Sequence, residues 1–251
     1  MRWFLFLLLM LPGSLTWAEE GEETKPPPRQ MRLLTVGERP PFRQEIRDGV
    51  RYELPPPPGS LPPVELEVSV PTKDGKEKET GSLRLRLGSI SKAIEVPGGA
   101  GQLVLRTPGD AADARPWRRI TRPEQGDFVV VLWKDHKTGT WDEPAAFVVP
   151  STLPPGKATL VNVAPGPVAV VYQSERIALP PGRPIMRALE PDKPLGLQVG
   201  LAEGNSLKRL VSRSIEQGRG QHSLVVFYRA DGEKPRRPLG IKVVRLGATS
   251  G

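Results

Sequence analysis

Only two histidines occur in the 251-residue chain, and they are the first residues to consider for metal binding or acid/base chemistry. His136 follows one apolar segment and His222 begins another. If the two segments are copies of one unit, the histidines lie near opposite ends of equivalent strands, so we expect no two-histidine metal site. Asp135 and His136 together with Asp142 would suit general acid/base catalysis, although a hydrogen-bonded polar loop uses the same residue types.

Acidic and glycine-rich segments suggest three further kinds of site. Loop carboxylates around one predicted strand would suit calcium, although their spacing matches no known calcium loop: Asp127, Asp135, Asp142 and Glu143. Glu65 and Glu67 share one strand face but lie too close in sequence to define a glycosidase pair. The segment Gly98–Gly101 is rich in glycine but does not open a helix, so a phosphate cradle there would lack the helix dipole.

Several reactive motifs are missing from the sequence. It contains no cysteine, and hence no thiolate nucleophile or thiolate metal ligand. It also contains neither a G-x-S-x-G nucleophile elbow nor a Walker loop. We therefore predict no catalytic residue, no metal ligand and no cofactor-binding residue, and we expect a protein that is not an enzyme.

The first 18 residues have the form of a secretory signal peptide. Arg2 precedes the apolar run Trp3–Pro12, and Thr16 and Ala18 occupy the small-residue positions before a cleavage site. The apolar run is too short to span a bilayer, which needs about 20 residues. An exported eukaryotic domain of this size usually carries disulfides, so the absence of cysteine favours a bacterial protein that is periplasmic or extracellular.

The chain is basic, with 36 lysines and arginines against 28 acidic residues and a net charge of +8. Its densest basic clusters are short: Arg115–Arg119, Lys208–Arg213 and Lys234–Arg237. They suit solvated strand faces and turns, and they also suit contact with an anionic envelope polymer or with lipid head groups. We expect no nucleic-acid binding, because the sequence shows neither a basic face with stacking aromatic residues nor a known reading motif.

Alternating and continuous apolar runs predict an all-β protein. Thirty prolines and 26 glycines suit many short strands joined by turns. Val64–Val70 and Ser82–Gly88 alternate on either side of a charged loop and predict a hairpin. Phe128–Lys134 is apolar almost throughout, so we expect a central strand that is buried on both faces. Met31–Val36 and Gly49–Leu54 are short strand candidates in the proline-rich stretch upstream.

The second half of the chain repeats the strand pattern of the first. The best-matched segments are Val129–Lys134 and Leu224–Arg229, which makes Trp133 and Tyr228 equivalent. Offsets of about 83 to 95 residues indicate a duplicated unit of about 90 residues, the size of an immunoglobulin-like sandwich. The remaining matches are Ala158–Val163 with Val64–Val70, Val168–Tyr172 with Leu85–Gly88, Ile177–Gly182 with Ile94–Gly99, Ser206–Ile215 with the segment around Trp117, and Ile241–Val244 with Ala146–Val149.

We therefore predict two tandem immunoglobulin-like β-sandwich domains behind a proline-rich N-terminal arm. The predicted units are a signal peptide at residues 1–18, an acidic and then proline-rich arm at 19–63, and sandwiches at 64–150 and 157–247. Within the arm, Leu54–Pro63 would act as a stiff spacer that caps an edge strand or passes the chain to a neighbour. The predicted core consists of Leu66, Val68, Leu85, Leu87, Val129, Val131, Trp133, Phe147, Leu160, Val168, Val170, Leu224, Val226 and Tyr228.

Asn162–Val170, followed by Leu179–Gly182, resembles the opening hairpin of uncharacterised bacterial exported β-sandwich proteins, with an Asn–small–Pro turn, an apolar strand and a Pro-Gly corner. The resemblance implies a tandem sandwich and no particular activity. We expect an exported, non-catalytic envelope protein that acts as a binding or assembly module. Two alternatives stay open: a carbohydrate-active or other hydrolase whose inter-domain cleft gathers at least three ionisable side chains, and a binder of anionic envelope polymers or lipid head groups.

Overall fold

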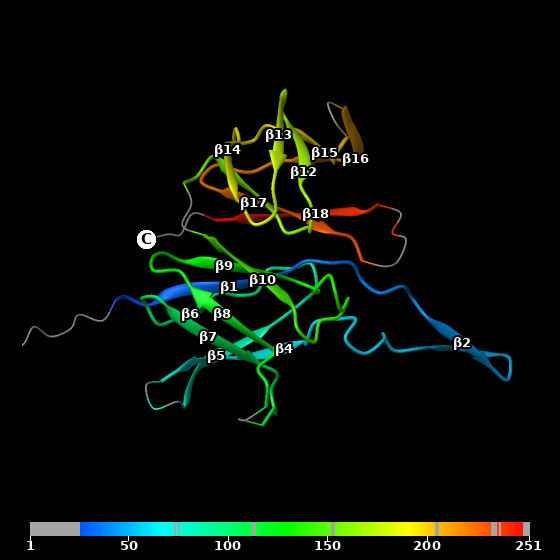
Figure 1. The fold of residues 1–251 in the computed structure, drawn as a ribbon, viewed down its shortest axis with the longest axis vertical. Helices are drawn as coiled ribbons and strands as arrows, with labels where there is room; N and C mark the ends of the chain where they lie inside the picture. The colour runs from blue at the N-terminus through cyan, green and yellow to red at the C-terminus, as the bar shows by residue number, and fades with distance from the viewer. Residues whose placement is uncertain are drawn as a thin grey trace, which may run out of the picture.

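Strands make up all the regular secondary structure in the computed structural model. It describes residues 26–72, 74, 76–111, 114–151, 154–203, 206–231, 235 and 237–247, and the predicted signal peptide lies outside these ranges. Eighteen β-strands and no helix occur in the described residues. The all-β prediction is confirmed, and the strands form two stacked sandwiches (Figure 1).

The first sandwich packs two four-stranded sheets face to face. The order is β10-β9-β1-β6 in the inner sheet and β5-β4-β7-β8 in the outer sheet. β1 and β9 run parallel, and the other neighbours are antiparallel. The core between the sheets includes Leu66, Leu132 and Trp141. The strands are β1 (Arg29–Thr35), β4 (Glu65–Pro71), β5 (Glu77–Arg84), β6 (Ile94–Val96), β7 (Gly101–Arg106), β8 (Arg118–Arg122), β9 (Phe128–Trp133) and β10 (Ala145–Pro150).

The second sandwich has the same construction. Its inner sheet has the order β14-β11-β17-β18, its outer sheet has the order β13-β12-β15-β16, and β11 and β17 run parallel. Leu160, Val170 and Phe227 lie in its core. The strands are β11 (Lys157–Asn162), β12 (Val168–Tyr172), β13 (Glu175–Leu179), β14 (Ile185–Ala188), β15 (Leu195–Glu203), β16 (Ser206–Ile215), β17 (His222–Arg229) and β18 (Leu239–Leu246).

The two strand orders match strand for strand, with β1 and β4–β10 equivalent to β11–β18. Hydrogen bonds made by the last residues of the equivalent strands β1 and β11 also correspond. Thr35 Oγ1 donates a hydrogen bond of 3.0 Å to the carbonyl of Arg86, just after β5, and Asn162 Nδ2 donates one of 2.8 Å to the carbonyl of Leu179, at the end of β13. Both bonds therefore tie the first strand of an inner sheet to the outer sheet.

This correspondence corrects the first half of the repeat alignment. β11 is equivalent to β1 and not to the segment Val64–Val70, β12 is equivalent to β4, and β13 is equivalent to β5. The later matches agree with the topology, since β16, β17 and β18 correspond to β8, β9 and β10. The early matches were wrong because extra chain between β1 and β4 displaces β1 from the spacing of the repeat.

β1 is a central strand of the first sandwich, so this domain starts before the predicted boundary at Val64. Its backbone pairs with β9 on one side and β6 on the other. Met31 and Leu33 enter the first core, and Leu34 faces the second domain. The predicted arm at 19–63 therefore contains a core strand, followed by an insertion at residues 38–63, which we call the hairpin insertion.

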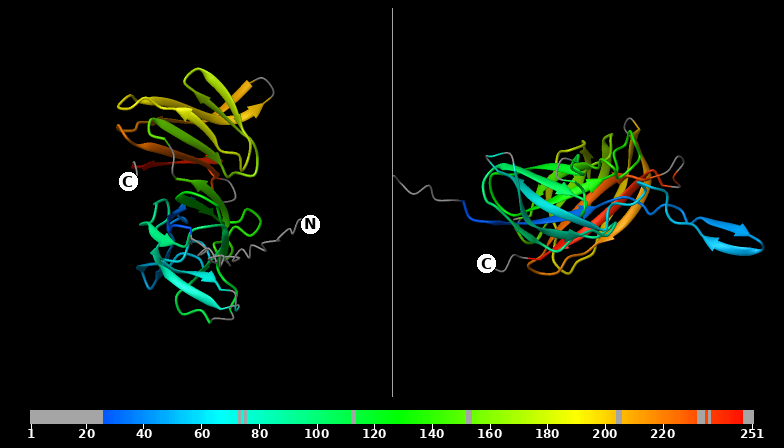
Figure 2. Two further views of the ribbon diagram at one scale, coloured as in Figure 1. Left: turned by 90° about the vertical axis from the view of Figure 1, so that its left-hand side faces the viewer. Right: turned by 90° about the horizontal axis from the view of Figure 1, so that it is seen from below.

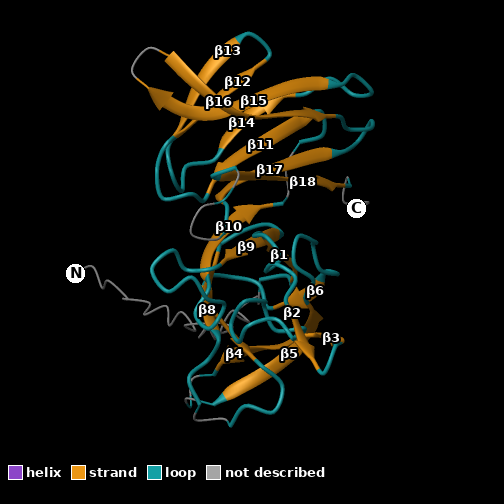
Figure 3. Cartoon of the chain, turned by 90° about the vertical axis from the view of Figure 1, so that its right-hand side faces the viewer, coloured by secondary structure: helices purple, strands orange, loops and turns teal. Residues whose placement is uncertain are grey.

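The two inner sheets pack against each other through a third apolar core. Alternate residues of β9 and β17 point into their own sandwich and toward the other domain, so both faces of each strand are buried, as predicted for Phe128–Lys134. The result is a stack of four sheets (Figures 2 and 3). The buried members of this inter-domain core are Leu34, Val36, Val129, Val131, Val149, Val161, Val163, Leu224, Val226, Val244 and Leu246.

All of the predicted core residues belong to one of the three cores. Four of them, Leu87, Trp133, Phe147 and Tyr228, are only partly buried, and the others are buried. Trp133 and Tyr228 both border the inter-domain core, as their predicted equivalence requires.

Candidate interaction surface

The hairpin insertion carries a two-stranded sheet of its own. β2 (Gln44–Arg47) and β3 (Val50–Glu53) pair antiparallel, with Arg47 opposite Val50. Asp48 and Gly49 connect them with φ values of 51° and 77°, as a type I′ turn requires. The β2–β3 hairpin projects away from both sandwiches, as Figures 1 and 2 show from two directions.

Large exposed apolar side chains gather on this insertion. Phe42 is 69% exposed, the highest value among the described large apolar residues. All but one of the others also lie in or directly after the insertion, and the exception is Met186 in β14. The members in this region are Phe42, Ile46, Val50, Tyr52, Leu61 and Val64. Such a concentration in one place is typical of a contact surface for another macromolecule.

The alternation of β3 shows that its apolar face is not packed against other described parts of the chain. Val50, Tyr52 and Leu54 recur at every second position, as in a strand with one face on a core. The described residues provide no such core, and both strands of the hairpin are exposed at every position. A lone two-stranded hairpin is marginally stable in water, so this exposed apolar pattern is a candidate contact surface.

An apolar groove of about 510 Å³ lies at the root of the hairpin, and we call it the root groove. Proline, leucine and aromatic side chains of the insertion form one wall, and the chain after β5 forms another. Its charged lining consists of Arg39, Arg43, Arg86 and Glu53, which leaves the groove basic. Its apolar lining includes Pro40, Pro41, Phe42, Leu54, Pro56, Leu61, Pro62, Val64, Leu85 and Leu87.

Two of the three predicted basic clusters lie at sheet edges. Arg115–Arg119 runs into β8, and Lys208–Arg213 lies in β16, and these are equivalent edge strands of the two outer sheets. Charged residues on an edge strand prevent unwanted pairing with other chains, which gives both clusters a structural role. In the third cluster, Lys234 and Arg236 lie outside the described residues.

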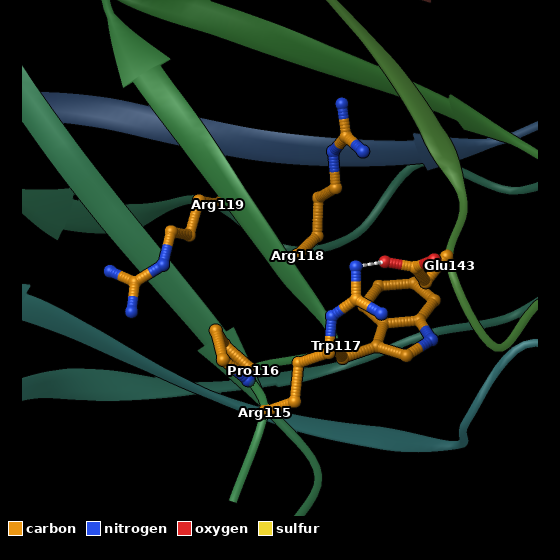
Figure 4. A pocket seen from close by; sticks show the side chains of 6 residues that line it. All are labelled: Arg115, Pro116, Trp117, Arg118, Arg119 and Glu143. Atoms are coloured by element: carbon orange, nitrogen blue, oxygen red, sulfur yellow. Dashed lines mark ion pairs between the residues drawn. The ribbon is translucent and has the colours of Figure 1, made fainter.

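A pocket of about 370 Å³ beside β8, the Arg115 pocket, gathers three of these arginines (Figure 4). Arg115 forms an ion pair with Glu143, and Arg118 and Arg119 point in different directions because consecutive strand residues alternate faces. The Trp117 indole, which also lines the pocket, donates a hydrogen bond of 2.5 Å to the carbonyl of Trp141. The guanidinium groups therefore do not converge on one point.

A third cavity, of about 300 Å³, lies between the domains and gathers five ionisable side chains, Lys134, Asp135, His136, Arg229 and Asp231. The Asp135 carboxylate accepts a hydrogen bond from the Lys137 N–H, and this bond lowers the pKa of Asp135.

Three of the other ionisable groups of this inter-domain cavity, Lys134, Asp231 and His136, link the two domains. Lys134 Nζ lies 3.2 Å from the Asp231 carboxylate, which also accepts a hydrogen bond of 3.0 Å from the Glu38 N–H. His136 Nε2 lies 3.3 Å from the carbonyl oxygen of Val163. These contacts hold loops of the two sandwiches together.

The structure separates the residues that the sequence grouped for catalysis or calcium binding. Asp142 lines a cavity beside Trp141 in the first domain, whereas Asp135 and His136 line the inter-domain cavity. Asp127 accepts a hydrogen bond from the Gln30 N–H at the opposite end of β9. No group of three or more potential metal ligands occurs in the part of the chain that the structure describes.

His222 is buried and lies at the start of β17, whereas His136 follows the end of the equivalent strand β9. The His222 Nδ1–H donates to the Pro154 carbonyl at 3.3 Å, and the His222 Nε2 accepts a hydrogen bond from Thr159 Oγ1 at 3.0 Å. Burial lowers the pKa of His222, with the hydrogen bond to Pro154 acting in the opposite direction. His222 is therefore a structural residue whose surroundings favour the neutral imidazole.

Two other predicted sites have structural explanations. Leu66, between Glu65 and Glu67, enters the core of β4, so the two glutamates share the opposite face of that strand. At Gly98, an added Cβ would lie 2.2 Å from the carbonyl oxygen of Pro27. Glycine is required there because the chain before β1 passes over this turn.

Sequence reasoning predicted β3, as Gly49–Leu54, but missed β2 and the turn between them, although the signal of the turn is present. Asp48-Gly49 is a strong dipeptide for a type I′ turn, and the alternating residues of β3 follow it. The prolines before and after the hairpin favoured an extended connection instead. None of the described residues forms a helix that would serve as a membrane span.

Comparisons with known proteins give a limited context. No protein-family model matches the chain, and no curated protein sequence matches it. Among solved structures, the chain is similar to the shaft pilin SpaA from Lactobacillus rhamnosus GG, with 5% sequence identity and a TM-score of 0.21, over 83% of this chain and 98% of the pilin chain.

Proposed function

We propose that this chain is an exported, non-catalytic protein of the bacterial envelope that acts as a binding or assembly module. The hairpin insertion and the root groove are its contact surface, and the two sandwiches are the scaffold that presents them. The signal-peptide pattern of residues 1–18 and the absence of cysteine support export to a bacterial envelope.

The observation that carries this proposal is the location of the exposed apolar side chains. The described residues keep nearly all of their large apolar side chains in three cores, and most of the exceptions lie in or next to the insertion. An apolar surface that projects from a rigid scaffold is suited to another protein, since protein contacts bury such side chains.

Site-specific photocrosslinking in the cells that make the protein tests this proposal. A photoreactive residue at Ile46 or Tyr52 should yield an adduct with a protein, because both positions lie on the proposed contact surface. Met186 is the matched control, since it is an exposed apolar residue on the second domain. Equal adducts from Met186 and from the hairpin, or adducts from Met186 alone, would contradict the proposal.

The basic edge strands β8 and β16 support a second candidate, which is contact with an anionic envelope polymer or lipid head groups. Arg119 is exposed on the edge strand β8, and Lys208 and Arg213 are exposed on the equivalent strand β16. Retention on heparin and on anionic vesicles at rising salt concentration measures this binding. An Arg119→Glu variant that elutes at lower salt than the wild type would favour this function over the first.

The inter-domain cavity supports the hydrolase alternative, because it gathers more than the three ionisable side chains that this alternative requires. The contacts of Asp135, Asp231 and His136 favour the module instead, since each group is already bonded to the chain around it. Turnover of glycan substrates that is lost in both Asp135→Asn and Asp231→Asn, with folding intact, would overturn the non-catalytic proposal.

A further inference from the structure

We infer that the hairpin binds a second copy of this chain, with the two β3 strands paired antiparallel around Tyr52. This inference rests on the proposed function, because it takes the hairpin as the contact surface. It adds the identity of the partner and the register of the contact. Three features of the hairpin support it: the direction of its backbone groups, the order of its charges and the position of its tip.

The hydrogen bonds inside the hairpin fix which backbone groups point outward. Leu54 N–H donates to the Arg43 carbonyl at 3.0 Å, so these two residues form a hydrogen-bonded pair. Glu45 and Tyr52 lie opposite each other two positions further along the same ladder, so they are a pair of the same kind. In an antiparallel ladder, bonded and non-bonded pairs alternate. The N–H and C=O groups of Arg51 and Glu53 therefore point toward the free edge of β3, where they are available to another strand.

Only one register of β3 on its copy joins opposite charges. Arg51 and Glu53 supply the outward backbone groups in both copies. Each of them must therefore lie opposite the partner's Arg51 or the partner's Glu53. A register centred on Arg51 or on Glu53 places like charges opposite each other, which destabilises a strand pair. The register centred on Tyr52 places Arg51 opposite the partner's Glu53, and Glu53 opposite the partner's Arg51.

The same register covers the exposed apolar face of β3. Tyr52 lies opposite the partner's Tyr52, and Val50 lies opposite the partner's Leu54. These residues share the face on which β3 alternates without a core, so pairing brings their apolar side chains together along the two central strands of a four-stranded sheet, flanked by Glu45 and Arg47 of each β2. The unexplained alternation of Val50, Tyr52 and Leu54 is thus accounted for by the second copy.

The tip of each hairpin then reaches the root groove of the other copy. In the Tyr52-centred register, Gly49 lies opposite the partner's Pro55 and Asp48 lies beside the partner's Pro56, which lines that groove. Asp48 is acidic and the groove is lined by Arg39, Arg43 and Arg86, so the charges are complementary. Pro55 lacks an N–H and limits the pairing to the length of β3.

The β2 edge offers a weaker alternative. A register centred on Ile46 also joins opposite charges, Glu45 with the partner's Arg47. However, Arg47 and Glu45 already form an ion pair of 2.8 Å within β2, and this register places the tip opposite Gln44 of the partner subunit, away from the groove. The β3 edge is therefore the one that pairs.

Charge reversal tests the inference in the mature chain from Glu19 onward, with sedimentation velocity as the measurement. The wild type should dimerise, and Arg51→Glu and Glu53→Arg should each raise the dimer dissociation constant at least tenfold. The double variant Arg51→Glu/Glu53→Arg should dimerise again, because its opposite charges exchange places. An equimolar mixture of the two single variants should form a heterodimer. A wild type that stays monomeric at high micromolar concentration would overturn the inference, as would single variants that dimerise normally.

Single cysteines test the register, because the chain has no cysteine of its own. In a non-bonded antiparallel pair the Cα atoms lie about 4.5 Å apart, within the range for a disulfide. Tyr52→Cys should give a disulfide-linked dimer faster than Ser212→Cys, an exposed control on β16. Faster linkage through Ile46→Cys would overturn the β3 register. Photocrosslinks from the hairpin to a different protein, without self-association, would overturn this inference and leave the proposed function standing.

Discussion

The two sandwiches share one strand order, yet they differ at one connection. In the second domain β11 passes to β12 through the short segment 163–167, which Asn162 holds in place. In the first domain the same connection holds the hairpin insertion, with its exposed strands and the root groove. The comparison shows that the sandwich is a framework common to both domains, and that the insertion, our proposed contact surface, belongs to the first domain alone among the described residues.

The domains also differ in how they stabilise this connection. Asn162 donates hydrogen bonds to the carbonyls of Gly166 and Leu179 and accepts one from the Ala164 N–H. Thr35, its equivalent, donates a bond to the carbonyl of Arg86. The short turn between the two sheets of the second domain needs several buried hydrogen bonds for its backbone groups. The long insertion leaves the sandwich, so water solvates its backbone.

The largest effect should come from the core that the two domains share. Leu224→Ala removes a fully buried side chain between the inner sheets, so we expect the free energy of unfolding to fall by about 2–5 kcal/mol. Chemical denaturation followed by fluorescence measures this change. Met186→Ala, at an exposed position, is the control and should have little effect. A small effect of Leu224→Ala would mean that the domains do not share a core in solution.

A second prediction compares the equivalent residues Asn162 and Thr35. Asn162→Ala removes three hydrogen bonds to backbone groups, whereas Thr35→Val removes one, and the Arg86 carbonyl still accepts a bond from the Ser89 N–H. A typical hydrogen bond contributes about 0.5–1.5 kcal/mol, so Asn162→Ala should destabilise the protein more than Thr35→Val. Equal midpoints of denaturation for the two variants would refute the difference between the connections.

A third prediction concerns pH. The folded-state pKa of His222 lies below its unfolded value, so the unfolded chain binds a proton first as the pH falls below about 6.5. The contribution of neutral His222 to the free energy of unfolding is therefore complete above that pH. It is lost as the pH drops toward the folded-state pKa of His222. Denaturation midpoints between pH 7 and 5.5 should therefore fall in the wild type and fall less in His222→Gln. The same slope in both proteins would exclude His222 as the cause.

The smallest effect should come from the hairpin. Replacing Gln44–Glu53 with a short glycine-serine linker should change the free energy of unfolding of the monomer by less than about 0.5 kcal/mol, because these residues bury nothing in the sandwiches. Thermal denaturation at low protein concentration measures this. A large loss of stability would show that the hairpin is part of the scaffold and would remove the contrast between the domains.

The sequence was most informative where apolar runs are continuous. Phe128–Trp133 has no polar side chain, and only a central strand between two cores buries all of them. β1 carries a similar signal, since Leu33 and Leu34 are adjacent and both buried on opposite faces. Met31–Val36 was correctly predicted as a strand, but it was placed in the arm and not in the first domain, because the repeat was aligned by spacing and the hairpin insertion altered the spacing between β1 and β4.

The contact surface was harder to predict because its pattern is that of an ordinary strand. Val50, Tyr52 and Leu54 alternate as if one face were covered, and sequence alone does not show whether the cover belongs to the same chain. The ionisable residues posed the opposite problem. Asp135 and Asp142 lie close in sequence but line different cavities, which depends on the path of the loop between β9 and β10.

Hydrogen–deuterium exchange of the mature chain at a dilution at which it is monomeric, alone and with an envelope extract of the cells that make it, tests the role of the insertion most directly. The hairpin and the root groove should gain protection, at the amides of Arg51 and Glu53 in particular, while β8 and the inter-domain loops stay unchanged. Protection of Arg118–Arg122 or of the loop around His136, with an unchanged hairpin, would contradict the proposal that the insertion is the contact surface.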